Sequence, residues 1–144
     1  MKRSVLLTFL AALAGVLAAC VPALQPGFNA DLTTAAEVPP PTLDGATPSG
    51  SSTAMLTGNT LTVTGNFAGL TGPATAAHIH GPAPVGEAAG VVFPLQVDNA
   101  VSGNLSGTWA DMTEEQLQQL RDGLFYVNVH TAMNGAGEIR GQLR

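Results

Sequence analysis

The sequence predicts an all-β fold: an antiparallel, Greek-key-like β-sandwich or barrel of about eight strands, with one short helix near 114–122. Three observations lead to this fold class. Short segments in which apolar and polar residues alternate recur along the chain. Turn-forming residues separate them, with 17 glycines and 10 prolines in 144 residues. Finally, Gly58-Asn59 lies between two such segments and is typical of a tight hairpin, because both residues tolerate the positive φ of primed turns.

The N-terminal 19 residues have the organisation of an export signal. Lys2 and Arg3 give a basic start, and the following apolar segment spans about 15 residues, which is short for a membrane span. Leu17-Ala18-Ala19-Cys20 then resembles the cleavage and lipidation site of bacterial lipoproteins. We therefore expect residues 1–19 to be removed and Cys20 to be lipidated.

Residues 20–27 would tether the lipidated cysteine to the domain that begins at Phe28. The expected location is outside the cytoplasm, anchored to the cell membrane or outer membrane and facing the periplasm or exterior. The alternative is an ordinary signal peptide followed by a free thiol at Cys20. The chain has 1 cysteine, so no internal disulfide can form.

The charge of the exported domain excludes one class of partner. Once residues 1–19 are removed, its basic residues are Arg121, Arg140 and Arg144, against the 10 acidic residues of the chain. Such a surface has no basic patch that could bind nucleic acid, and it would be repelled by anionic lipid. Membrane attachment would therefore depend on the acyl chains, and cations are the favoured small partners.

One domain over residues 28–144 accommodates all of the expected elements. Alternation and turn residues predict strands over 28–33, 53–57, 60–65, 75–80, 90–93, 105–110, 125–130 and 138–143. Residues 35–52, rich in Pro, Gly, Ser and Thr, are expected to form an ordered surface loop. Thr113 and Gln116 form a capping box for the helix, and Gly123 follows its last turn.

All 3 histidines lie in two of the predicted strands. Side chains alternate along a strand, so His78 and His80 share one face and Ile79 points to the other. His130 ends the strand that contains Tyr126 and Asn128, and these three likewise share a face. We expect the imidazoles to face away from the core and to form a surface metal site, with copper preferred to zinc.

The alternative is that these are exposed strand histidines that hold the rim of the sheet together without a ligand. A metal site also requires the strands over 75–80 and 125–130 to be neighbours, which one sequence does not establish.

The predicted hairpin of strands 125–130 and 138–143 supplies residues that would hydrogen-bond to the histidines and orient them. If His130 faces Glu138, an antiparallel register places Asn128 opposite Arg140 and Tyr126 opposite Gln142. Glu138 would then accept a ring N–H from His130 and fix its tautomer. Met133, in the loop between the two strands, is expected to be a packing residue rather than an axial copper ligand.

The chain resembles the CHRD domain family, named after repeats in the extracellular signalling antagonist chordin and found in bacterial exported proteins. The resemblance covers about Phe28 to Leu143. Its motifs are Phe28-x-Ala30-x-Leu32 with Glu37-Val38-Pro39-Pro40, Ala77-His78-Ile79-His80-Gly81-Pro82-Ala83, Tyr126-Val127-Asn128-Val129-His130-Thr131, and Gly137-Glu138-Ile139-Arg140-Gly141-Gln142-Leu143. It implies an all-β domain outside the cytoplasm and leaves the biochemical role open.

The histidine layout is also faintly similar to the copper site of copper-zinc superoxide dismutases, which use H-x-H, a later histidine and an arginine. His78, His80, His130 and Arg140 would fill these positions. The chain has no fourth histidine to bridge two metals and no cysteine pair. Only a copper-only dismutase therefore stays open, with Arg140 steering superoxide.

Three functions follow from these observations. The first is a lipid-anchored, metal-binding module that handles or senses copper or zinc. The second is a metal-free module that holds a protein partner of the cell envelope through loops 35–52 and 81–90. The third is a copper-dependent, dismutase-like enzyme, and an enzyme is the less favoured class because other catalytic motifs are missing from the sequence.

Overall fold

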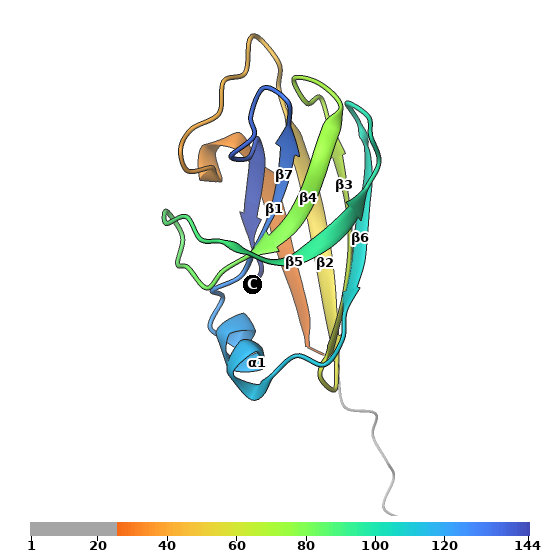
Figure 1. Ribbon diagram of the computed structural model, residues 1–144, viewed down its shortest axis with the longest axis vertical. Coiled ribbons are helices and arrows are strands. Elements are labelled where there is room, and N and C mark those ends of the chain that lie inside the picture. Colours follow the sequence, from red (N-terminus) through yellow and green to blue (C-terminus); the bar gives the residue numbers. More distant parts are fainter. Residues whose placement is uncertain (1–25) are drawn as a thin grey trace, which may run out of the picture.

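The structure is a computed structural model that describes residues 26–144, and its strands form a closed antiparallel barrel (Figure 1). The predicted signal peptide, Cys20 and most of the predicted tether 20–27 lie outside the described residues. Of the two architectures expected for an all-β fold, the sheet adopts the barrel.

Eight strands and one α-helix make up the domain, as predicted. They are β1 (Gly27–Thr33), β2 (Ser49–Thr57), β3 (Thr60–Ala68), β4 (Ala74–His80), β5 (Val91–Val97), β6 (Gly103–Trp109), α1 (Glu114–Arg121), β7 (Tyr126–Thr131) and β8 (Ile139–Gln142), with a short 3-10 helix η1 (Thr34–Ala36) after β1. The strand order around the barrel is β1-β2-β3-β6-β5-β4-β7-β8, and the pair Thr33 and Arg140 closes β1 onto β8. The links β3 to β4 and β6 to β7 each join strands that are not neighbours, which confirms a Greek-key-like topology.

Two local signals in the sequence act as expected. Thr57 pairs with Thr60 across the Gly58-Asn59 turn, and only Gly58 takes a positive φ, of 61°, as in a type II′ turn. At α1 the hydroxyl of Thr113 accepts from the N–H of Gln116, whose side chain accepts from the N–H of Thr113. The hairpin turn and the start of α1 are therefore determined locally.

The N-terminal part of β2 differs from the prediction. Residues 49–52, expected to belong to a loop, are strand residues that pair with both β1 and β3. Ser52 is buried, and its hydroxyl donates to the carbonyl of Thr64 at 3.1 Å. A β carbon at Gly50 would lie 2.5 Å from the carbonyl oxygen of Asn66, so only glycine permits this close approach of strands. Cross-strand pairing thus overrides the polar composition of the segment.

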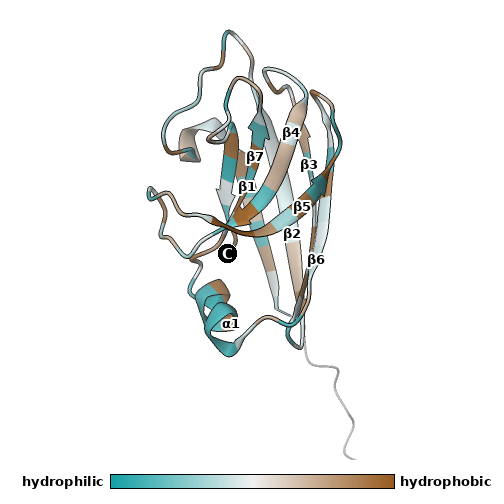
Figure 2. Ribbon diagram, viewed as in Figure 1, coloured by the Kyte–Doolittle hydropathy of each residue, from teal (hydrophilic) through white to brown (hydrophobic). Residues whose placement is uncertain are grey.

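The barrel interior is the hydrophobic core. Ile79 of β4, Val127 and Val129 of β7 and Ile139 of β8 are completely buried there. Helix α1 lies at one end of the barrel, with Leu117 and Leu120 buried and a hydrophilic exposed side (Figure 2). No helix among residues 26–144 is long and apolar enough to cross a membrane.

Strand β7 is buried on both of its faces. Its inner residues pack in the core, and its outer residues are covered by the segments 37–48, 81–90 and 132–138. Gln142 of β8 connects the segment 81–90 to the barrel by donating to the carbonyl of Ala83, and Asn134 connects the segment 132–138 to the backbone of Thr42 in the segment 37–48. A second, polar layer therefore lies between the barrel wall and the loops.

Candidate metal centre

The three histidines come together on the outer face of two neighbouring strands. Strands β4 and β7 pair antiparallel, with His78 opposite Asn128, His80 opposite Tyr126 and Ala76 opposite His130. Residues directly opposite one another share a face, so the imidazoles of both strands point to the same side of the sheet. The neighbourhood of the two strands, which the sequence left open, is confirmed.

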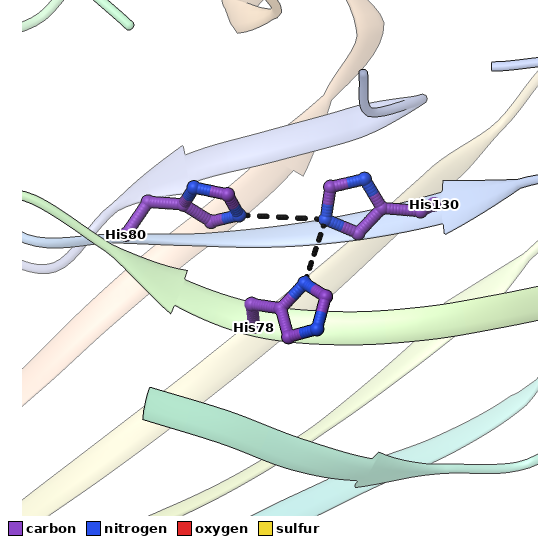
Figure 3. Close-up of side chains that lie close together, drawn as sticks. All are labelled: His78, His80 and His130. Atoms are coloured by element: carbon purple, nitrogen blue, oxygen red, sulfur yellow. Dashed lines mark hydrogen bonds between the residues drawn. The ribbon is translucent and has the colours of Figure 1, made fainter. Parts of the chain in front are cut away.

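The three rings present nitrogen atoms to one another (Figure 3). Nδ1 of His78 lies 3.0 Å from Nε2 of His130, and Nε2 of His80 lies 3.4 Å from the same Nε2. One nitrogen from each ring lies within 4.8 Å of the other two. This spacing suits three ligands of a single ion.

Backbone carbonyls determine which nitrogen of two rings carries the proton. Nδ1 of His80 lies 2.9 Å from the carbonyl oxygen of Ala89, and Nδ1 of His130 lies 3.1 Å from that of Gly135. A carbonyl oxygen can only accept, so both Nδ1 atoms carry the proton in the neutral rings. The Nε2 atoms of His80 and His130 are then both unprotonated and face each other.

Burial keeps these imidazoles neutral. His80 and His130 are each 7% exposed, and His78 is half-buried. Burial is the main cause that lowers the pKa of all three, and the neighbouring histidines contribute to lowering that of His130 to about 4. Neutral imidazole is the form that binds metal. The rings point away from the core, as predicted, but the loops cover His80 and His130, so the cluster is not the surface site that was predicted, and these two are not the exposed strand histidines of the alternative either.

Tyr126 and Arg140 lie behind His80 in the polar layer. The Tyr126 ring stacks on His80 with centroids 5.1 Å apart, and its hydroxyl contacts both the N–H and the carbonyl of Ala89. The Arg140 guanidinium lies 3.5 Å from the centroid of Tyr126 on the ring face. The predicted pairs Tyr126 with Gln142 and Asn128 with Arg140 are confirmed.

The predicted contact between Glu138 and His130 is wrong. Glu138 is completely buried and accepts instead from the N–H and hydroxyl of Thr71, the hydroxyl of Thr131 and the side-chain amide of Asn134. The regular register ends at Val129 and Ile139, and Gly137 has a φ of 137°, so the backbone leaves the strand before Glu138 can face His130. The carbonyl of Gly135 fixes the His130 tautomer in its place.

Burial alone would raise the pKa of Glu138, but the hydrogen bonds from Thr131, Thr71 and Asn134 together lower it below its usual value. Glu138 therefore serves as an ionised anchor that joins the β7–β8 loop to the end of β7 and to the loop between β3 and β4. Met133 is 52% exposed, so it is not the packing residue that was predicted.

Sequence reasoning missed Glu37 as part of the polar layer. It is 4% exposed, and its Oε1 accepts from the N–H of Val38 and from Nδ2 of Asn128. Burial raises the pKa of Glu37, and the charge of Arg140 acts in the opposite direction. The motif Glu37-Val38-Pro39-Pro40 marked this position, but only the fold shows that Glu37 reaches β7.

The sequence profile of the CHRD domain matches residues 28–143. The chain belongs to the CHRD domain family. The match covers the whole barrel, including all three histidines and the segments that cover them. No curated protein and no solved structure matches the chain closely enough for comparison.

Proposed function

We propose that this CHRD domain binds one transition-metal ion, copper in preference to zinc, through Nδ1 of His78 and Nε2 of His80 and His130. In the proposal the domain is held at the membrane by a lipid on Cys20 and handles or senses metal outside the cytoplasm. The domain would then act as a carrier or sensor rather than as an enzyme.

One observation carries the proposal: two unprotonated Nε2 atoms face each other 3.4 Å apart in a buried site. Nδ1 of His78 can donate a hydrogen bond to Nε2 of His130. Nε2 of His80 then still faces Nε2 of His130 with no proton between the two atoms. Two lone pairs that face each other in a low-dielectric site repel, and a cation between them removes the repulsion. The donor set therefore fits a metal ion.

The ligand chemistry favours copper. The cluster of possible ligands among residues 26–144 consists of three imidazoles, without a thiolate or carboxylate. Imidazole suits both copper and zinc, and for a given nitrogen site the affinity for Cu²⁺ exceeds that for Zn²⁺. When bound, copper would supply a one-electron couple, and the protein would hold it away from bulk water.

A protein-interaction role is the second candidate. Val85 in the segment 81–90 is 57% exposed, and Val91, which pairs with His80, is 53% exposed. Val91 therefore lies next to the candidate metal centre and Val85 in a segment that covers it, and exposed apolar side chains there would suit contact with an envelope protein. The two roles are compatible, because a metal carrier needs a surface that meets its partner.

The dismutase-like function has less support from the geometry. Steering of superoxide by Arg140 would require its guanidinium to meet the solvent, but Arg140 is 1% exposed. Its Nη2 instead bonds to the carbonyl of Pro84 and to the side chain of Gln142.

The test is elemental analysis of the full chain after equilibration with equal copper and zinc, followed by desalting. We expect close to one copper per chain and little zinc. His130→Ala should abolish retention, because His130 lies between the other two rings. The matched control is Gln118→Ala, an exposed position on α1 that should retain the metal.

Retention of copper by the His130→Ala variant, or no retention by the unaltered chain, would contradict the proposal. Near-ultraviolet circular dichroism of each variant separates loss of the site from loss of the fold.

A further inference from the structure

Arg140 is a buried cation without a carboxylate in direct contact. It is 1% exposed, and the two hydrogen-bond partners of its Nη2 atom, Pro84 O and Gln142 Oε1, are neutral. Its Nη1 atom is buried without a hydrogen-bond partner among the described residues. Arginine stays protonated in proteins, so its positive charge is fixed in this layer, where it interacts electrostatically with the buried carboxyl of Glu37.

The positive charge of Arg140 lies close to His80, one ligand of the candidate metal centre, with the Tyr126 ring between them. The guanidinium lies over the face of Tyr126 at 3.5 Å, and Tyr126 stacks on His80 with an angle of 8° between the ring planes. Three flat groups are thus layered in the order Arg140, Tyr126, His80. The Tyr126 hydroxyl and Nδ1 of His80 both bond to Ala89, and Nη2 of Arg140 bonds to Pro84 and Gln142, so all three members of the stack are held in place.

A fixed positive charge raises the energy of added positive charge nearby, and the effect is larger when water is excluded. A divalent ion carries twice the charge of a monovalent ion, so its binding is opposed more strongly. Arg140 should therefore discriminate between the two oxidation states of copper.

We propose that Arg140, held against His80 through Tyr126, is a positioning residue that biases the three-histidine site toward Cu(I) relative to Cu(II). This inference rests on the proposed function, because it requires that the site bind copper. It specifies the oxidation state of the copper ion that the site favours, and it assigns a role to the buried Arg140.

The experiment measures the dissociation constants of the full chain for Cu(I) and Cu(II) separately, each by competition with a chromophoric chelator, Cu(I) under strict exclusion of oxygen. In Arg140→Gln the ratio of the Cu(II) to the Cu(I) dissociation constant should fall about tenfold, because one unit charge is removed from a low-dielectric layer. A tenfold fall corresponds to a reduction potential lower by about 59 mV for a one-electron couple.

Three further variants control for charge and fold. Arg121→Gln removes an exposed arginine from α1 and should leave the ratio unchanged. Arg140→Lys keeps the charge, so its ratio of the Cu(II) to the Cu(I) dissociation constant should stay close to that of the unaltered chain. Gln142→Glu places a carboxylate where Oε1 of Gln142 accepts from Nη2 of Arg140, and it should lower the ratio as well. Because it loses the Nε2 hydrogen bonds to the carbonyls of Ala83 and Gly123, near-ultraviolet circular dichroism checks that it folds.

Absence of copper binding in the unaltered chain would overturn the proposed function itself. Normal copper binding with an unchanged ratio in folded Arg140→Gln, or in Gln142→Glu where Arg140→Gln does not fold, would overturn only the role of Arg140.

Discussion

At the scale of single residues, Gly137 makes the polar layer possible. Its φ is 137°, and a β carbon there would lie 2.4 Å from the Asn128 amide and 2.5 Å from Oε2 of Glu37. Gly137→Ala should therefore lower the free energy of unfolding by roughly 2–3 kcal/mol. Urea denaturation measures this change.

Gly135→Ala, two residues earlier in the same loop, is the matched control. A β carbon at Gly135 would meet nothing within 4 Å, so we expect a change within about 0.5 kcal/mol. Equal stability of the two variants would show that Glu37 and Asn128 are not packed against Gly137.

The low pKa of His130 makes the stability of the metal-free protein depend on pH. Its pKa is lowered from 6.5 to about 4, so below pH 6.5 the unfolded chain binds a proton that the folded protein does not. Stability is therefore lost as the pH falls from 6.5 to 4, and the loss is complete below 4. We expect about 2 kcal/mol to be lost between pH 7 and 5 because of His130.

Urea denaturation across this range, with His130→Gln as the comparison, isolates the contribution of this residue. The variant should lose less stability than the unaltered protein as the pH falls. Parallel curves for the two proteins would contradict the burial of an uncharged His130.

The ligands of the candidate site could be predicted from the sequence, but the groups that orient them could not. Alternation along strands is a strict geometric rule, so it places His78 and His80 on one face of their strand and His130 on the outer face of its own. Only the fold shows that the two strands are neighbours. The groups that fix their tautomers are the carbonyls of Ala89 and Gly135, and every residue carries a carbonyl. The carboxylate of Glu138 is the most conspicuous candidate in the sequence for orienting His130, but it accepts hydrogen bonds from Thr71, Thr131 and Asn134 instead.

At the scale of elements, Asn134 connects two loops and thereby holds the cover of the site. Its Oδ1 accepts from the N–H of Thr42 at 2.8 Å, and its Nδ2 donates to the Thr42 carbonyl at 2.9 Å and to Glu138 at 2.7 Å. Asn134→Ala should release the segment 37–48 from the barrel and cost about 2 kcal/mol of stability. Relative to the unaltered protein, amide hydrogen exchange should become at least tenfold faster in the segment 37–48 and should change less in the rest of the domain.

Asn66→Ala provides the comparison for this variant. Asn66 is exposed on β3 and donates to the hydroxyl of Ser51, so its removal should leave exchange in 37–48 unchanged. Protection of 37–48 that survives Asn134→Ala would mean that other contacts hold the loop.

The strands and helix were predictable because each carries its own signal. Apolar alternation marks β3 and β4, Gly58-Asn59 marks the hairpin between β2 and β3, and Thr113 with Gln116 marks the start of α1. The segment 49–52 carries no such signal, because Ser49-Gly50-Ser51-Ser52 resembles a linker. It is a strand because β1 and β3 pair with it on both sides, and this depends on residues distant in the sequence.

At the scale of the whole molecule, the site joins parts of the barrel that lie far apart in the sequence. Strands β4 and β7 supply the ligands, and the segments 81–90 and 132–138 supply the carbonyls behind them. A metal that binds only this assembled state stabilises it by mass action. Copper at about 100 times its dissociation constant should add about 2.7 kcal/mol to the free energy of unfolding.

Thermal unfolding with and without copper measures this linkage. The midpoint should rise for the full chain and for Gln118→Ala, and it should stay constant for His130→Ala. A rise of the same size in the His130→Ala variant would place the bound copper elsewhere.

The most direct measurement is a crystal structure of the copper-loaded protein, with anomalous scattering recorded on both sides of the copper absorption edge. We expect one copper peak per chain, bonded to Nδ1 of His78 and to Nε2 of His80 and His130, with the carbonyls of Ala89 and Gly135 still accepting from Nδ1 of His80 and His130. A peak at any other position, or copper bonded to Nδ1 of His80 or His130, would contradict it.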